Sequence, residues 1–285
     1  MSYDWNWFFS AFSQCGAAII GIIGAFVISR ILNNNNKFND LNNDLKKLEI
    51  THHDLFKRIK ALQIENYIHK VIWSCSYIRS LHDKGKLEIN KDTLKLVYLN
   101  CPNLYKADSQ IIKEINTILE NLGSYQNSYN NFRNSSIEFI NSTKPKIDDL
   151  NFRAENNIQF YNHNRIEFQN LKNDFKSLSL VIIVLLVALY ITVIYPLHFL
   201  PLEINQFPSL SLNYENLLSH LFSAKGVLLT LFFATFGIIL GYLIIISIKK
   251  IKKIDNILSD KELIKLSKSE SYSEYFLHIG ISDDK

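Results

Sequence analysis

The sequence contains few residues that break helices or cross-link a small fold. Its 285 residues include only five Pro, nine Gly and three Cys. This scarcity of Pro and Gly argues against a turn-rich all-β fold and favours long helices. The cysteines, Cys15, Cys75 and Cys101, are too few and too widely spaced to indicate a disulfide framework or a metal site. We therefore expect structural roles for all three and reduced thiols at Cys75 and Cys101.

The chain also lacks a large net charge. It has 31 Lys and Arg against 27 Asp and Glu, a formal net charge of +4 that is too small to indicate nucleic-acid binding by itself. Charged residues still make up 20% of the sequence, which argues against a disordered chain. The mean hydropathy is +0.01. Because that average fits neither a soluble domain nor a polytopic transporter, the apolar residues must be unevenly distributed.

Three long apolar stretches account for this uneven distribution, at residues 8–32, 178–195 and 226–248. About 20 apolar residues in a helix cross the roughly 30 Å hydrocarbon core of a bilayer. Three buried core helices are the alternative, but core helices this long and this uniformly apolar are uncommon. The first stretch is not typical of a signal peptide, because no Lys or Arg precedes it and its apolar run is too long.

The basic residues predict one orientation in the membrane. All but two of the 31 Lys and Arg lie in residues 33–177 and 249–285, the exceptions being Arg30 and Lys225. Basic residues beside the ends of spans mark the cytoplasmic side. We therefore expect a multi-pass protein of the bacterial inner (plasma) membrane, with its N-terminus outside and its C-terminus in the cytoplasm. The expected parts are 1–33 (outside N-terminus and transmembrane helix 1), 34–177 (cytoplasmic helical domain), 178–195 (transmembrane helix 2), 196–225 (outside loop), 226–248 (transmembrane helix 3) and 249–285 (cytoplasmic basic helix and tail).

A heptad repeat follows the first apolar stretch and predicts a coiled-coil helix over residues 37–82. A weaker repeat over 147–178 predicts a return helix that begins after a break at Pro145. The two helices would form an antiparallel stalk, with further helices in residues 88–145. The predicted fold class is thus an all-α membrane protein with three transmembrane helices and a coiled-coil-like cytoplasmic domain between the first two. The main seam residues are Leu41, Leu45, Leu48, His52, Leu55, Ile59, Leu62 and Asn66.

Small residues recur along the first and third apolar stretches. The first has one at every fourth position, and the third has a G-x-x-x-G pair; the residues are Ser13, Ala17, Gly21, Ala25, Ser29, Gly237 and Gly241. Such ridges let two membrane helices approach closely. They indicate either packing within one subunit or association of several copies into a homo-oligomer.

No Asp, Glu, Lys, Arg or His lies deep in any apolar stretch, although proton relays and ion-coupled transporters usually need such residues. A channel remains open as an interpretation, because hydroxyl groups and hydrophobic constrictions can line a pore. Gln14 has the alternative of a shallow, partly hydrated site near the outer interface. The candidate pore-lining residues are Ser10, Gln14, Thr192, Thr230 and Thr235.

The tail begins with a basic cluster and ends with aromatic residues. Lys249, Lys250, Lys252 and Lys253 directly follow the third apolar stretch, where they serve as a topology signal and are expected to contact anionic lipid at the cytoplasmic face. Farther along, Tyr272, Tyr275, Phe276 and Leu277 predict a segment that docks on the cytoplasmic domain or binds a partner.

The sequence shows no motif of a catalytic or cofactor-binding site. It has no phosphate-binding loop, no dinucleotide fingerprint, no nucleophile elbow and no H-E-x-x-H pair. The neighbours His52 and His53 point about 100° apart on a helix, which suits a shared metal poorly. We therefore expect no enzymatic activity and no cofactor or metal, and the chain carries no direct nucleic-acid signature.

The opening segment YDWNWFFSAFSQCGAAIIGIIGAFVISRIL, residues 3–32, resembles the start of uncharacterised bacterial inner-membrane proteins of the phage-defence membrane-effector type. The resemblance implies a membrane effector that is paired with a separate cytoplasmic sensor protein and permeabilises the inner membrane when activated. Two hypotheses follow. The chain is a channel-like or membrane-disrupting effector controlled by its cytoplasmic domain, or it is a non-conducting anchor, scaffold or sensor that binds a protein partner through its coiled coil.

Overall fold

The computed structural model describes the chain except for residues 1–4, 87, 102–103, 122–128, 199–221 and 279–285. Every element in the described ranges is a helix, which confirms the predicted all-α class. Most of the predicted outside loop, 196–225, and the end of the tail lie outside the described residues. The elements are α1 (Trp5–Ala61), α2 (Ile64–Ser74), α3 (Ser76–Asp83), α4 (Lys91–Asn100), α5 (Asp108–Asn121), α6 (Tyr129–Leu189), a π-helix (Tyr190–Ile194), α7 (Tyr195–His198), α9 (Ala224–Ser259), α10 (Lys261–Lys265) and two 3-10 helices (Ser269–Ser271 and Glu274–His278).

The described helices form two compact units. Unit 1 comprises residues 1–43 and 165–259, and unit 2 comprises residues 44–164 and 260–285. The two longest helices, α1 and α6, each contribute residues to both units. Unit 1 therefore contains the three apolar stretches, and unit 2 contains the short helices α2 to α5 together with the segment that follows α9.

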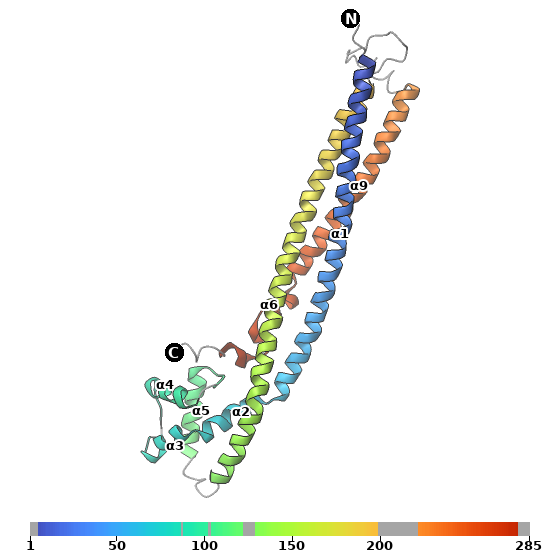
Figure 1. Ribbon diagram of the computed structural model, residues 1–285. Helices are drawn as coiled ribbons and strands as arrows, with labels where there is room; N and C mark the ends of the chain where they lie inside the picture. The colour runs from blue at the N-terminus through green and yellow to red at the C-terminus, as the bar shows by residue number, and fades with distance from the viewer. Residues whose placement is uncertain (1–4, 87, 102–103, 122–128, 199–221, 279–285) are drawn as a thin grey trace. The chain divides into compact units, whose positions relative to one another are not determined.

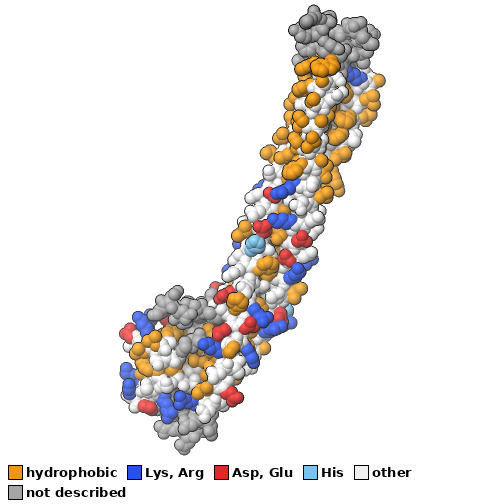
Figure 2. Space-filling view, in the orientation of Figure 1, with side chains coloured by type: hydrophobic (Ala, Val, Ile, Leu, Met, Phe, Trp, Pro, Cys, Tyr) orange, Lys and Arg blue, Asp and Glu red, His pale blue; other side chains and the backbone are white. Residues whose placement is uncertain are grey.

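Unit 1 is built from three helices, α1, α6 and α9, that run side by side (Figure 1). All three are long and apolar enough to cross a membrane. One cluster of their shared core consists of Val27, Ile31, Leu178, Ile182, Leu185 and Leu240. At most 28% of any apolar window is buried, so hydrophobic side chains cover much of the surface of unit 1 (Figure 2). An apolar surface of this extent is typical of contact with lipid or with another protein.

α1 approaches the π-helix that follows α6 closely at Gly16. A Cβ built on Gly16 would lie 2.7 Å from Oγ1 and 2.8 Å from Cβ of Thr192. Thr192 lies in the π-helix, and its hydroxyl donates a hydrogen bond to the carbonyl oxygen of Ala188 at 2.8 Å. Gly16 thus lets the backbone of α1 lie close to Thr192. Any residue with a side chain at this position would force one of the two helices to shift.

Unit 2 has a larger apolar core than unit 1. Its most deeply buried side chains come from α2 and α5, where isoleucines recur at helical spacing and pack against α3, α4 and parts of α1 and α6. Asn90 caps α4 by accepting a hydrogen bond from the backbone N–H of Thr93 at 2.9 Å. The central residues are Ile68, Ile72, Ile111, Ile115 and Leu119.

The predicted coiled-coil helix over 37–82 is wrong in its extent. The helix ends at Ala61, and Gln63 adopts a left-handed conformation with φ of 47°. The chain then turns into α2 and α3, whose isoleucines fill the core of unit 2, so tertiary packing overrides the continued heptad. Of the predicted seam, Leu41, Leu45, Leu48, Leu55 and Ile59 are buried, His52 and Leu62 are half-buried, and Asn66 is exposed.

The predicted break at Pro145 is also wrong, because α6 is continuous from Tyr129 to Leu189 with Pro145 inside it. Proline removes one backbone hydrogen bond from a helix interior. Burial on either side offsets that loss, since Thr143 is 5% exposed and Ile147 is fully buried. The weaker repeat is buried along its whole length, at Ile147, Leu150, Ala154, Asn157, Tyr161, Asn164, Phe168, Leu171, Phe175 and Leu178.

The structure contradicts the expectation of reduced thiols at Cys75 and Cys101. The two residues form a disulfide with a Cα–Cα distance of 6.2 Å, and both are buried. Cys75 joins α2 to α3 and Cys101 follows α4, and α3 packs on α4. The pairing is therefore a product of this packing, which the separation of 26 residues does not reveal. Cys15 is exposed and unpaired.

Candidate functional site

A cavity of about 630 Å³ lies in unit 2 and is lined by charged and aromatic side chains. Its size falls within the range of small-molecule sites, roughly 300–1,000 Å³. The walls come from α2, the loop before α5, α5 itself and the 3-10 helix Glu274–His278. The lining includes Glu65, His69, Tyr105, Lys106, Gln110, Lys113, Glu114, Thr117, Glu274 and Tyr275.

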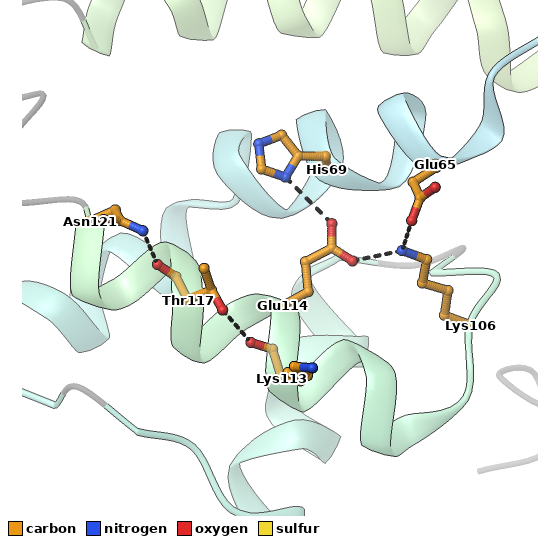
Figure 3. A network of polar contacts seen from close by, with 7 residues as sticks. All are labelled: Glu65, His69, Lys106, Lys113, Glu114, Thr117 and Asn121. Carbon is orange, nitrogen blue, oxygen red and sulfur yellow. Dashed lines mark hydrogen bonds and ion pairs between the residues drawn. The ribbon is translucent and has the colours of Figure 1, made fainter.

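Lys106 is the centre of a polar network in this cavity (Figure 3). Its ammonium group donates hydrogen bonds to Glu114 Oε2 at 2.9 Å and to Glu65 Oε1 at 3.1 Å. The other oxygen of Glu114 lies 3.4 Å from Nδ1 of His69. The side chains of Lys106 and Glu114 are only 11% and 17% exposed. Because both charges are largely removed from water, each depends on the other for compensation.

The network determines the protonation states of its members. Burial alone would raise the pKa of Glu114, but the hydrogen bonds from His69 and Lys106 and their charges lower it below its ordinary value. Burial would likewise lower the pKa of Lys106, but its bonds to Glu114 and Glu65 raise it. The pair is therefore fully charged at neutral pH.

The loop that carries Lys106 is held by its neighbours. Tyr105 is buried, stacks on Tyr67 with ring centroids 6.0 Å apart, and donates a hydrogen bond from its hydroxyl to Asp148 at 3.2 Å. Burial, followed by the charge of Asp148, raises the pKa of Tyr67 to about 12. Because both phenols stay protonated and the disulfide fixes Cys101 just upstream, the position of Lys106 is constrained from two sides.

The segment after α10 closes the unit and forms one wall of the cavity. Tyr272 and Phe276 are buried in the core of unit 2, while Glu274 and Tyr275 face the cavity. The hydroxyl of Tyr272 accepts a hydrogen bond from Asn157 Nδ2 at 2.9 Å. This confirms the prediction that the aromatic tail docks on the helical domain.

His52, a predicted seam residue, contacts the same segment. Its Nε2 lies 3.2 Å from the carbonyl oxygen and 3.1 Å from Oγ of Ser271, and its ring packs on Tyr272 at a centroid distance of 4.4 Å. Burial lowers the pKa of His52, and the nearby His53 lowers it further, against the raising effect of the hydrogen bond to Ser271. The docked segment thus favours a neutral imidazole.

The cavity is suited to binding a charged small molecule. It presents carboxylates, amines, an imidazole and phenol groups, and the carboxylate of Glu65 is 73% exposed. Within the described ranges, no group of three or more His, Cys, Asp or Glu side chains is placed to hold a metal ion. Since Lys106 already pairs with two carboxylates, an arriving ligand would compete for one partner of an existing ion pair.

The predicted packing residues of the apolar stretches lie mostly on the outside of unit 1. Ser13 is buried, whereas Ala17, Gly21, Ala25 and Ser29 are exposed. Gly237 and Gly241 are half-buried, and a Cβ built on either one, or on Gly21, would meet no atom within 4 Å. Among the described glycines of the apolar stretches, Gly16 has the atoms of Thr192 within 4 Å of a built Cβ, and the four-residue ladder did not include it.

The candidate pore-lining residues bond locally. The side-chain amide of Gln14 lies 3.5 Å from the hydroxyl of Ser10, both on α1. The hydroxyls of Thr192, Thr230 and Thr235 each donate to the carbonyl oxygen four residues earlier in their own helix. Ser10 and Thr192 are half-buried, and Gln14, Thr230 and Thr235 are exposed.

The basic cluster after the third apolar stretch divides into two pairs. Lys249, Lys252 and Lys253 are exposed, and Lys250 is half-buried. Lys250 and Lys253 place their ammonium groups 4.3 Å and 5.2 Å from the ring centroid of Phe38. The sequence does not distinguish the four lysines, because only the tertiary structure brings Phe38 beside two of them.

Sequence reasoning missed the Lys106 network, since Glu65, Lys106 and Glu114 share no motif and meet only after folding. Comparison of the chain with family models, with curated proteins and with solved structures finds no match.

Proposed function

We propose that the chain is a multi-pass protein of the bacterial inner membrane that acts as a channel-like or membrane-disrupting effector controlled by its helical domain. The observation that carries this proposal is the continuity of α1 and α6, each of which runs without interruption from an apolar stretch into unit 2. A continuous helix transmits a rotation or shift at one end to its other end. The resemblance of residues 3–32 to phage-defence membrane effectors points in the same direction.

The cavity around Lys106 is the proposed receiving site for the signal. A ligand or a sensor protein that displaces Glu65 or Glu114 from Lys106 alters the contact between α2, α5 and the docked segment. Glu274 and Tyr275, which also line the cavity, lie in the chain segment that follows α9. Binding in the cavity would therefore also act on the third apolar helix through this segment. The trigger is thus coupled to all three apolar helices through the chain itself.

A pore or membrane lesion requires several copies of the chain, and the apolar surface of unit 1 leaves room for them. Ala17, Gly21 and Ala25 form an exposed strip of small side chains on α1, which supports close packing with another copy. We therefore propose a homo-oligomer. Substituting Gly21 by Leu is expected to reduce the oligomer observed by cross-linking in membranes, whereas an unchanged oligomer would show that the strip faces lipid.

Membrane potential in bacteria tests the effector role. The full chain is expressed alone and together with the genes that neighbour it, while a potential-sensitive dye reports depolarisation. Lys106→Met is compared with Lys113→Met, which changes a lysine on the same cavity wall that forms no ion pair in the described residues. We expect Lys106→Met to change depolarisation strongly and Lys113→Met to change it little. An unaltered potential in every condition would refute the effector role.

The orientation, N-terminus outside and unit 2 in the cytoplasm, is tested separately because the two indications differ. The basic flanks favour the cytoplasm for unit 2, whereas a disulfide is typical of an oxidising compartment. We give more weight to the flanks, because several basic residues agree on the same side. Lys84→Cys, an exposed position in unit 2, is introduced together with Cys15→Ala, which removes the free thiol, and should resist labelling by a membrane-impermeant maleimide in intact cells. Rapid labelling would place unit 2 outside.

A non-conducting anchor, scaffold or sensor is the second candidate, and one observation favours it. Unit 2 exposes large apolar side chains outside the apolar stretches, with Ile50 71%, Phe152 62% and Phe160 45% exposed. Such positions are typical of a protein-binding surface. Cross-linking in cells followed by purification would reveal a partner, and Phe152→Ser should remove it while leaving the membrane potential unaffected. Both candidate roles are non-enzymatic.

A further inference from the structure

Two lysines beyond the third apolar stretch share a single aromatic ring. The stretch ends at Ile248, and α9 continues for several turns beyond it. Lys250 and Lys253 are one turn apart on α9, and both ammonium groups lie over Phe38 of α1. Phe38 is 1% exposed and contacts Phe168 of α6 on another side, with ring centroids 6.0 Å apart. The lysines therefore cover a ring that unit 1 holds rigidly.

The other basic residues that link helices in this part of unit 1 have carboxylate partners. Arg30 pairs with Asp174 at 3.1 Å, Lys37 pairs with Glu167, and Lys172 pairs with Asp255. Among the described residues, neither Lys250 nor Lys253 has a carboxylate within salt-bridge distance. The nearby carboxylates are thus engaged by other cations, and these two ammonium groups keep an uncompensated double positive charge.

The two ammonium groups repel each other, and an anion between them would relieve that repulsion. Both ammonium groups lie within 5.2 Å of one centroid, so they are separated by no more than about the 10 Å Debye length at 0.1 M salt. Attraction to the face of the ring holds each lysine in place but does not reduce the repulsion between them. A phosphate group between the two would accept hydrogen bonds from both and would neutralise the pair.

We infer that Lys250 and Lys253, with the ring of Phe38 beneath them, bind the phosphate group of an anionic phospholipid. The lipid is favoured over a soluble phosphate because the lysines begin two residues after the apolar stretch, at the depth where headgroups lie if α9 spans the bilayer. This inference rests on the membrane insertion included in the proposed function. It also divides the basic cluster, since Lys249 and Lys252 face away from Phe38 and serve only as general positive charge.

The test uses the full chain purified in a neutral detergent and the two pairs of lysines as matched variants. Lys250→Gln/Lys253→Gln and Lys249→Gln/Lys252→Gln remove the same charge from the same helix. Native mass spectrometry measures the fraction of each protein that retains one phosphatidylglycerol, with phosphatidylcholine as the neutral control. Phe38→Leu keeps an apolar side chain but removes the ring, and thermal unfolding of each variant confirms that it is folded.

We expect the Lys250→Gln/Lys253→Gln protein to bind phosphatidylglycerol about 30-fold more weakly, because each lysine beside an anionic lipid contributes roughly a fivefold change in affinity. The Lys249→Gln/Lys252→Gln protein should lose about threefold or less, since its lysines lie outside the site. Equal losses in both variants would indicate diffuse attraction and overturn the inference. Displacement of the lipid by millimolar inorganic phosphate would assign the site to a soluble anion and overturn the lipid assignment.

Carbonate extraction of the expressing membranes separates this inference from the function on which it rests. If the wild-type chain remains in the washed membrane and the two double variants bind lipid equally well, the headgroup site is refuted and the membrane function is not. A chain that carbonate removes from the membrane refutes the proposed membrane function as well.

Discussion

Removal of the Cys75–Cys101 disulfide should destabilise unit 2 by a predictable amount. The bond closes a loop with a sequence separation of 26 residues. In the chain-entropy description, a cross-link of this span restricts the unfolded chain by about 3.5 kcal/mol. Both sulfur atoms are buried, and Cys101 lies just before the loop that carries Tyr105 and Lys106. Loss of the bond therefore lowers the stability of unit 2 in two ways. It raises the conformational entropy of the unfolded chain, and it loosens the folded unit near the cavity.

The assay is guanidinium unfolding of the full chain in detergent, followed by the fluorescence of Trp73. Trp73 packs against the core of unit 2 and lies two residues before Cys75. The chain has three Trp, so Trp5→Phe/Trp7→Phe provides a background in which the signal comes from unit 2. The comparison is between this background and the same chain with Cys75→Ala/Cys101→Ala.

With a dependence on guanidinium of about 4 kcal/mol per molar, the loss corresponds to a fall of roughly 0.9 M in the unfolding midpoint. Reduction of the disulfide with a dithiol should reproduce this shift, and Cys15→Ala should leave the midpoint unchanged because Cys15 is unpaired. A midpoint that stays the same after reduction would refute the reasoning, since the covalent link would then contribute nothing to the unit.

Three further predictions concern the other contacts. Gly16→Ala should lower the stability of the chain against thermal unfolding in detergent by about 1–3 kcal/mol, because the new methyl group overlaps Thr192. Gly21→Ala should have no such effect, because its methyl group would meet no atom within 4 Å. Tyr272→Ala should destabilise unit 2 by about 3–5 kcal/mol through loss of a buried ring. Tyr272→Phe should destabilise it by about 1–3 kcal/mol, because the side-chain amide of Asn157 loses its hydrogen bond to the Tyr272 hydroxyl. Equal unfolding midpoints for the wild type and the two variants would contradict this. Docking of residues 269–278 should weaken as the pH falls below about 6.5, because the lowered pKa of His52 makes the undocked state bind more protons there. The protection factor of the segment, which is its amide exchange corrected for the pH dependence of the intrinsic exchange rate, should fall in the wild type and stay constant in His52→Gln.

The sequence predicted those features that are averaged over many residues. An apolar stretch of about 20 residues is recognisable without tertiary information. α1 and α9 contain the first and third stretches within their bounds, and the second runs from α6 through the π-helix to Tyr195. The ten positions of the weaker repeat are all buried, because a period near 3.5 reports the side of a helix that faces its neighbours. The aromatic tail was predicted to dock on the helical domain or to bind a partner, and Tyr272 and Phe276 follow the first alternative.

Features that depend on a single residue or on distant partners were not predictable. Gln63 is an ordinary polar residue, yet its left-handed conformation ends α1 and directs α2 into unit 2. Pro145 lies inside the continuous α6, with Thr143 and Ile147 buried on either side of it, although the dipeptide Lys144-Pro145 itself indicates a break. The Lys106 network and the two lysines over Phe38 each join segments that no spacing rule connects.

The position of Tyr272 and Phe276 in the core of unit 2 has a consequence for biosynthesis. These side chains follow α9 in the chain, so the core of unit 2 stays incomplete while the ribosome still holds the third apolar helix. All three apolar helices are therefore synthesised before unit 2 can close. This order of events delays completion of the controlling domain until the helices it is proposed to control have left the ribosome.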